Sequence, residues 1–189
     1  MSVLGSGLSD AELHEDALSV MEANLSMRRR LGASESNILV TQSNLSGTYQ
    51  ALGRLEEAMC LRRDVYSGWL KIGGEEHRNT LREANNYASL LKRLKHFGEA
   101  KSLLRKTTRV ALRVLGEDHD TTLKSRWLYA EALYKDDGAT LDDLREAVTT
   151  LEDATRIARR VLGGAHPTTN GIEAALREAR AALRTREGA

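Results

Sequence analysis

Three copies of a short phrase bring histidine together with acidic or glycine residues. The phrase reads IGGEEH from Ile72, VLGEDH from Val114 and VLGGAH from Val161. Imidazole and carboxylate groups bind zinc and related ions through bonds of about 2 Å. The first chemistry to consider is therefore a metal site formed by the histidines that end the phrases, His77, His119 and His166.

The spacing of the phrases argues against such a site. Their glycines are Gly74, Gly116 and Gly163, and Gly32 is an earlier counterpart, so the chain repeats after 42, 42 and 47 residues. A repeat of this length places one phrase in each layer of a stack. Because packed helices lie roughly 8 to 10 Å apart, histidines of different layers cannot bind one ion. We predict no metal and no cofactor, and we expect the histidines to cap helices and to pack between layers.

The composition favours helices. Of the 189 residues, 41% are apolar but only 4% are aromatic, so a core must come mainly from Leu, Ala and Val. Pro167 is the single proline, which leaves long stretches without a residue that breaks helices. We therefore expect an all-α protein.

The charge balance and the single cysteine exclude several classes of protein. Twenty-eight Lys and Arg face 27 Asp and Glu, so the chain has no overall attraction to nucleic acid or to an anionic membrane. Cys60 alone cannot form an internal disulfide or a paired-cysteine zinc site. We find no secretory signal and no apolar run of about 18 residues, so we expect no membrane insertion and a cytoplasmic location.

Each repeat is predicted to contain two helices. Apolar positions return at steps of three and four residues on both sides of a turn around Gly53. The glycine of each phrase should end one helix and the polar residues after it should start the next. Pro167 suits the first turn of a helix, where its missing N–H costs little. The second helices are expected to turn one set of side chains inward: Ala58, Val65, Trp69 and Ile72, then Ala100, Thr107, Ala111 and Val114, then Ala147, Ala154, Ala158 and Val161.

Two segments carry the motif of a known family. NLSGTYQALGRLEEA, residues 44–58, has a leucine, a small residue, a tyrosine, a glycine and an alanine at set steps, and NYASLLKRLKHFGEA, residues 86–100, largely repeats them. These residues are Leu45, Ser46, Tyr49, Gly53 and Ala58 in the first segment, and Tyr87, Ala88, Phe97 and Ala100 in the second. With the period of 42 and the LGEDH-like turns, the chain resembles the tetratricopeptide domain of kinesin light chains and their relatives.

The resemblance covers about residues 10–186 and implies a right-handed α-solenoid of antiparallel helix pairs. The heptad segment that attaches kinesin light chains to the motor heavy chain is not found, so motor association is not predicted. The expected organisation is a tail over residues 1–9, a half repeat over 10–31, repeats over 32–73, 74–115 and 116–162, the last with an insertion within 135–143, and a capping helix over 163–186.

The resemblance also implies a concave groove, lined by the first helices of successive repeats, that binds a peptide of another protein. The positions carried over to this chain are Val40 and Asn44, Arg82 and Asn86, and Lys124 and Leu128. Arg82 and Lys124 would favour an acidic segment, and the asparagines could bond to a partner's backbone. Val40 and Leu128 interrupt the pattern of a carboxylate clamp. Asn85 and Trp127 precede groove positions, and Trp127 is predicted either to anchor a partner or to pack on the neighbouring repeat.

Three functions are weighed from the sequence. The first is a non-enzymatic adaptor that binds another protein through Asn44, Arg82, Asn85, Asn86, Lys124 and Trp127. The second is a scaffold subunit of a larger complex that uses its outer helices or its ends. The third and weakest is an enzyme, since no phosphate loop and no nucleophile with a credible base is found. The oligomeric state is not predicted.

Overall fold

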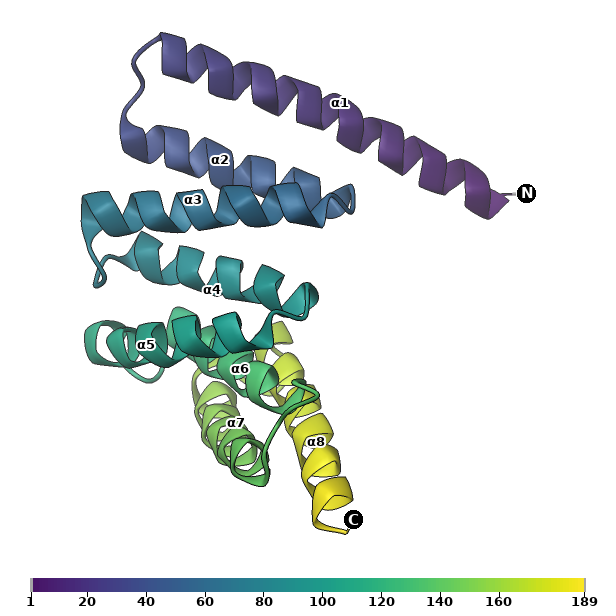
Figure 1. Ribbon diagram of the computed structural model, residues 1–189, viewed down its shortest axis with the longest axis vertical. Coiled ribbons are helices and arrows are strands. Elements are labelled where there is room, and N and C mark those ends of the chain that lie inside the picture. The colour runs from purple at the N-terminus through teal and green to yellow at the C-terminus, as the bar shows by residue number, and fades with distance from the viewer. Residues whose placement is uncertain (1, 189) are drawn as a thin grey trace. The chain divides into compact units, whose positions relative to one another are not determined.

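The computed structural model describes the backbone of residues 2–188 and the side chains of residues 15–188. The described chain contains eight α-helices and no strand, which confirms the predicted all-α class (Figure 1). The helices are α1 (Ser2–Arg30), α2 (Glu35–Ala51), α3 (Leu55–Gly73), α4 (Arg78–Arg93), α5 (Phe97–Leu115), α6 (Asp120–Tyr134), α7 (Leu141–Leu162) and α8 (Pro167–Glu187). No helix searched in the described part is long and apolar enough to cross a membrane.

The chain divides into two compact units, one ending at Glu83 and the other beginning at Ala84. The boundary falls within α4, so the start of this helix packs in the first unit and the rest packs in the second. In the first unit, α2 packs against both α1 and α3. Leu18, Leu25 and Leu45 are buried between the helices, and Leu39 is buried with Trp69 at the other end of α2.

A glycine of α3 allows α2 to approach closely. A methyl group at Gly68 would come within 2.5 Å of Cδ2 of Leu39. The glycine therefore makes room for the leucine at the centre of this small core, beside Val65 and Trp69.

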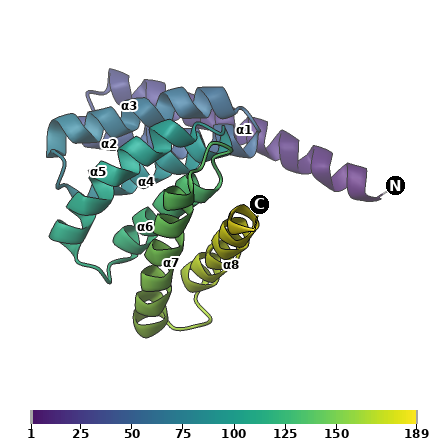
Figure 2. The same cartoon turned by 60° about the horizontal axis from the view of Figure 1, so that its bottom comes forward.

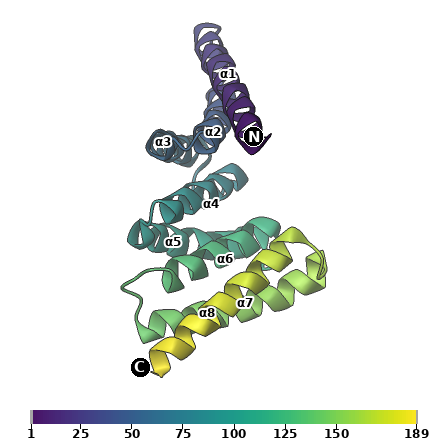
Figure 3. The same cartoon turned by 90° about the vertical axis from the view of Figure 1, so that its right-hand side faces the viewer.

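In the second unit, α6 packs against α5 and α7, and α7 lies antiparallel to α8 (Figures 2 and 3). The core is continuous across these helices and consists mainly of Leu and Ala, as the low aromatic content predicts. Ala147, Leu151, Ala154 and Ala158 are completely buried along α7. Small side chains at this spacing let the helices pack closely.

Glycine and histidine form the turns between repeats, as expected. Gly74, Gly116 and Gly163 follow α3, α5 and α7 with φ between 77° and 89°, a region in which glycine has no steric penalty. After two of them, the Nδ1 atoms of His119 and His166 accept hydrogen bonds from the backbone N–H groups of Thr121 and Thr168. These histidines cap α6 and α8, and Pro167 occupies the first turn of α8.

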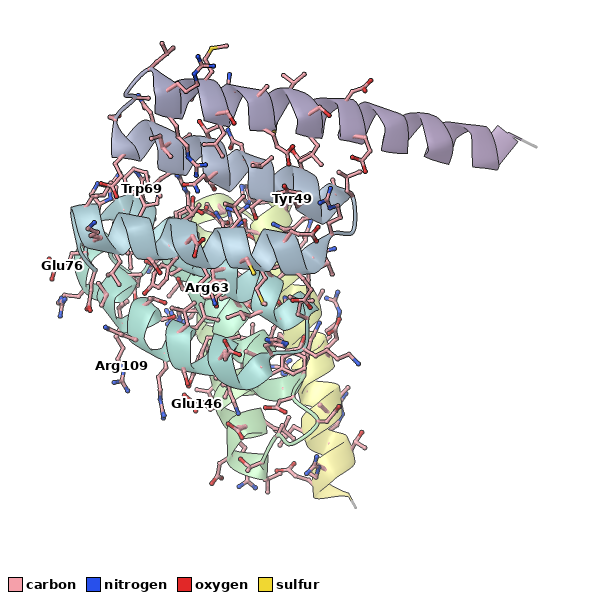
Figure 4. All side chains as sticks on the ribbon, turned by 45° about the horizontal axis from the view of Figure 1, so that its top comes forward. Tyr49, Arg63, Trp69, Glu76, Arg109 and Glu146 are labelled. Carbon is pink, nitrogen blue, oxygen red and sulfur yellow. The ribbon has the colours of Figure 1, made fainter. Side chains whose placement is uncertain are left out.

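His77 has a second role besides capping. Its Nδ1 accepts from the N–H of Asn79, and its ring stacks on that of Trp69 with 5.4 Å between centroids. Figure 4 shows Trp69 near the end of α3, beside the turn that holds Glu76. This histidine therefore ties the turn to the core of the first unit.

Two details of the predicted organisation were wrong. Residues 2–9 were expected to be a tail, but α1 already begins at Ser2. The glycines of this segment weaken a helix but do not terminate one, and no proline interrupts it. Of the inward set, Ile72, Val114 and Val161 are 39% to 45% exposed, because each lies in the last turn of its helix, beside the turn rather than between helices.

The turn between α6 and α7 lies within residues 135–143, where the sequence predicts an insertion. The turn spans residues 135–140, and the remaining residues to Asp143 already belong to α7. Thr140 and Asp143 form a reciprocal capping box at the start of this helix.

Candidate functional site

A hollow of about 290 Å³ opens between α4 and α6 in the second unit, and we name it the α4–α6 hollow. It contains four of the six residues that the sequence predicted for partner binding: Asn85, Asn86, Lys124 and Trp127. The other lining residues are Ser89, Lys92, Leu128 and Glu131. The lining positions recur at three- and four-residue steps on each helix, which places them on one face.

Asn85 fixes the two helices that form the hollow. Its Nδ2 donates to the backbone oxygen of Thr121 at 2.9 Å, and its Oδ1 accepts from the hydroxyl of Ser125 at 2.7 Å. The side chain is buried, so these bonds replace water. Asn85 therefore holds α4 against α6, while its neighbour Asn86 is only half buried and also lines the hollow.

Glu131 places a negative charge at the rim of the hollow. The carboxylate is buried and forms ion pairs with Lys92 and with Lys135. Lys135 also contacts Glu178 on α8, which accepts a hydrogen bond from the hydroxyl of Tyr134 at 2.8 Å. Because of the Tyr134 hydrogen bond and the Lys135 contact, the pKa of Glu178 is lowered. Glu131 therefore neutralises much of the positive charge of Lys92 and Lys135.

Lys124 is held more loosely than Lys92, the other lysine that lines the hollow. Its Nζ lies 2.9 Å from Asp120, one helical turn earlier on α6, and both side chains are more than 40% exposed. An exposed pair at this spacing contributes about 0.3 to 0.5 kcal/mol. Lys124 can therefore exchange its partner at little cost.

Trp127 packs on the neighbouring repeat, which is one of its two predicted roles, and it also lines the hollow. A methyl group on Gly171 of α8 would come within 2.2 Å of Cη2 of the indole, which shows how closely the ring lies on this glycine. The indole Nε1 is buried and has no hydrogen-bond partner among the described residues. The ring is thus held rigidly at the hollow by an apolar contact.

The two remaining predicted residues lie in the first unit. Asn44 is exposed on α2, and Arg82 is 54% exposed on α4 with its Nε 3.4 Å from Oε1 of Glu83. Neither residue lines the α4–α6 hollow.

A buried ion pair in the first unit was not foreseen. Nη1 of Arg62 on α3 contacts Oε2 of Glu83 at 2.9 Å, and the hydroxyl of Ser43 on α2 donates to the same carboxylate at 3.0 Å. One repeat later, the corresponding positions are Asn85 for Ser43, Leu104 for Arg62 and Ser125 for Glu83. Comparing residues 42 apart would have shown that this place is charged in one repeat and uncharged in the next.

No group of three or more His, Cys, Asp or Glu side chains in the described part of the chain is arranged to hold a metal ion. The repeated histidines are instead engaged in the helix caps described above.

Comparison with known proteins supports the fold. The model of a tetratricopeptide repeat family matches residues 80–120. No curated protein shows significant sequence similarity to the chain.

Solved structures resemble the whole chain. The kinesin light chain protein of nearly identical tetratricopeptide-like repeats from Podosopora anserina has a TM-score of 0.74 and 24% identity, over 100% of this chain and 92% of that one. A single-substitution variant of it has a TM-score of 0.76 and 23% identity, over 100% and 91%. BtubC (BKLC) from P. vanneervenii has a TM-score of 0.70 and 17% identity, over 92% of this chain and 72% of that one.

Proposed function

We propose that this chain, which has the tetratricopeptide fold of kinesin light chain-like proteins, is a non-enzymatic adaptor that binds a segment of another protein in its α4–α6 hollow. Tetratricopeptide repeats are protein-binding scaffolds, and their stacked helices offer extended surfaces. The observation that carries the proposal is the hollow itself, in which apolar, amide and charged side chains of two helices meet. Such a mixture of an apolar surface with a few polar groups suits recognition.

An apolar side chain of the partner is expected to contact Trp127 and Leu128. Both residues line the hollow and pack on the core of the second unit. Because Gly171 already fixes the indole ring, little side-chain freedom is lost when a partner binds. A rigid aromatic side chain is the usual anchor of a protein interface.

An acidic side chain of the partner is expected at Lys124. The exposed Asp120 pair is weak, so a carboxylate of the partner can replace it. Lys92 is less available, because a partner that withdrew it from Glu131 would leave a buried carboxylate with a weaker set of charges. We therefore propose a segment with one acidic residue beside an apolar one, and not a uniformly acidic segment, because the pairing of Lys92 with Glu131 leaves Lys124 as the accessible positive charge of the hollow.

The six predicted residues then have different roles. Lys124, Trp127 and Asn86 are proposed as contacts of the partner in the second unit, and Asn85 as the residue that holds the hollow open. Asn44 and Arg82 remain proposed contacts within the first unit, where both are exposed.

The test is a pull-down from the source cell with the wild-type chain and a Lys124→Glu variant. Arg109→Glu is the matched control, since it makes the same change of charge on exposed α5, where Figure 4 labels the residue. Circular dichroism should first show equal helix content. Partners that are lost from Lys124→Glu but retained by Arg109→Glu support the proposal. Partners that are retained by both variants exclude the hollow as their binding site. An Arg82→Glu variant tests the first unit separately.

A further inference from the structure

The three most exposed large apolar side chains of the described residues lie together at α1. Val20 is 68% exposed, Met27 59% and Leu31, in the turn directly after the helix, 76%. At about 100° per residue, their positions fall within a sector of about 40°. Leu18 and Leu25 are buried on the opposite side, toward α2. We name the exposed residues Val20, Met27 and Leu31 the α1 stripe.

An uncovered stripe of this kind is unusual in a solenoid. Repeats of a solenoid bury their apolar faces against neighbouring helices, so exposed apolar side chains along one helix face offer a surface on which another helix can pack. Contiguous apolar surface on a monomer marks a place where another molecule binds. We therefore expect another protein surface to pack on the α1 stripe.

We propose that a second copy of this chain covers Val20 and Met27 of the α1 stripe, with the two α1 helices antiparallel around a two-fold axis near Ala23 and Asn24. In this arrangement Val20 of one copy lies against Met27 of the other, and the reverse contact follows by symmetry. Ala23 is exposed at the centre and is small enough to let the helices approach closely.

The charges around the stripe are complementary in this arrangement. Asp16 lies before the stripe on the same side of α1, and Arg30 lies near its other end; both are exposed. Because the helices run in opposite directions, Asp16 of each copy comes beside Arg30 of the other. A parallel pairing would instead place like charges together, which is unfavourable.

A head-to-tail stack of copies is the alternative, and the last helix disfavours it. The exposed residues of α8 include Arg177, Arg180 and Arg184 on one side. Stacking the α1 stripe on this helix would bury apolar side chains against guanidinium groups and bring further arginines, at residues 28–30, close to them. The two-fold pairing avoids both costs and closes after two copies.

Sedimentation equilibrium of the purified chain over a wide concentration range tests the proposal. We expect a reversible dimer with twice the chain mass of 20.9 kDa. The Val20→Glu, Met27→Glu variant should weaken the dimer by more than about a hundredfold in Kd. Val161→Glu is the matched control, since this exposed valine of α7 lies outside the stripe, and it should leave the Kd unchanged.

Exchange of charges tests the antiparallel direction. Asp16→Arg alone and Arg30→Asp alone should each weaken self-association, whereas an equimolar mixture of the two variants should restore a mixed dimer. A monomeric wild-type chain, a dimer that survives Val20→Glu with Met27→Glu, or larger open assemblies would each overturn the proposal. Single variants that dimerise as well as the mixture would overturn the antiparallel pairing.

Discussion

The carboxylate of Glu83 and the guanidinium of Arg62 form a buried ion pair, with 2.9 Å between Oε2 and Nη1. Burial lowers the pKa of Arg62 and the neighbouring Glu83 opposes this, so the arginine stays charged. One repeat later, Leu104 and Ser125 occupy the corresponding positions without any charge. The same place in the fold can therefore hold either a buried ion pair or uncharged side chains.

The first prediction follows from this equivalence. Arg62→Leu leaves Glu83 buried without its main partner and should lower the free energy of unfolding by about 3 to 5 kcal/mol. The variant Ser43→Asn, Arg62→Leu, Glu83→Ser copies the residues of the next repeat and should recover most of this loss. Urea unfolding followed by circular dichroism measures both. Equal losses in the single and the triple variant would show that the two places are not interchangeable.

The second prediction concerns Trp127 and Gly171. Gly171→Ala forces the indole to move and should destabilise the chain by about 1 to 3 kcal/mol, despite the higher helix propensity of alanine. Gly47→Ala on α2 meets no atom within 4 Å and should stabilise by about 0.5 to 1 kcal/mol. Thermal unfolding of both variants separates the effect of contact from that of propensity. A stabilising Gly171→Ala would contradict the close packing of Trp127.

The third prediction concerns the turn before α5. Lys95 has a φ of 61°, where Gly53 stands one repeat earlier with a φ of 74°. A side chain in this region costs about 1 to 2 kcal/mol, so Lys95→Gly should stabilise and Gly53→Lys should destabilise. Part of the gain is offset because glycine is more flexible in the unfolded chain. Changes of the same sign in the two variants would be inconsistent with this strain.

The fourth prediction is a loss of stability at alkaline pH. Burial and a hydrogen bond to Glu146 raise the pKa of Tyr129 to about 12, whereas an unfolded tyrosine ionises near its ordinary value of about 10. The contribution of Tyr129 is complete below about pH 10 and declines as the pH rises through about 12. Tyr129→Phe should therefore make unfolding less dependent on pH in this range. An absorbance titration of tyrosinate in which every tyrosine ionises near the ordinary pKa of about 10 would contradict the raised pKa of Tyr129.

Much of the fold follows from local sequence signals for helix ends and turns. Glycine with positive φ, a histidine cap and one proline at the start of α8 depend only on neighbouring residues, so their spacing predicted the turns. The ends of the second helices were less predictable, because the periodicity of Val114 says nothing about what covers the last turn.

The candidate site was predictable in position but not in charge. The resemblance to the tetratricopeptide family implied Asn86 and Lys124 as groove positions and Trp127 as the residue before one, and the structure brings these three into one hollow. The pairing of Lys92 with Glu131 depends on side chains 39 residues apart across two helices. The contact of Trp127 with Gly171 likewise needs the packing of α8, which no local pattern reveals.

The contacts between first helices of successive repeats differ in kind along the chain. Ser43 meets the charged Glu83, Asn85 meets the hydroxyl of Ser125, and Trp127 meets the bare backbone of Gly171. In an array of identical repeats, a helix could dock one repeat too early or too late without any chemical mismatch. Here a slip by one repeat would place Ser43 of α2 against Ser125 of α6, and Asn85 of α4 against the bare backbone of Gly171 on α8. Neither residue would then find its native partner, so the side chains themselves specify the order of the layers.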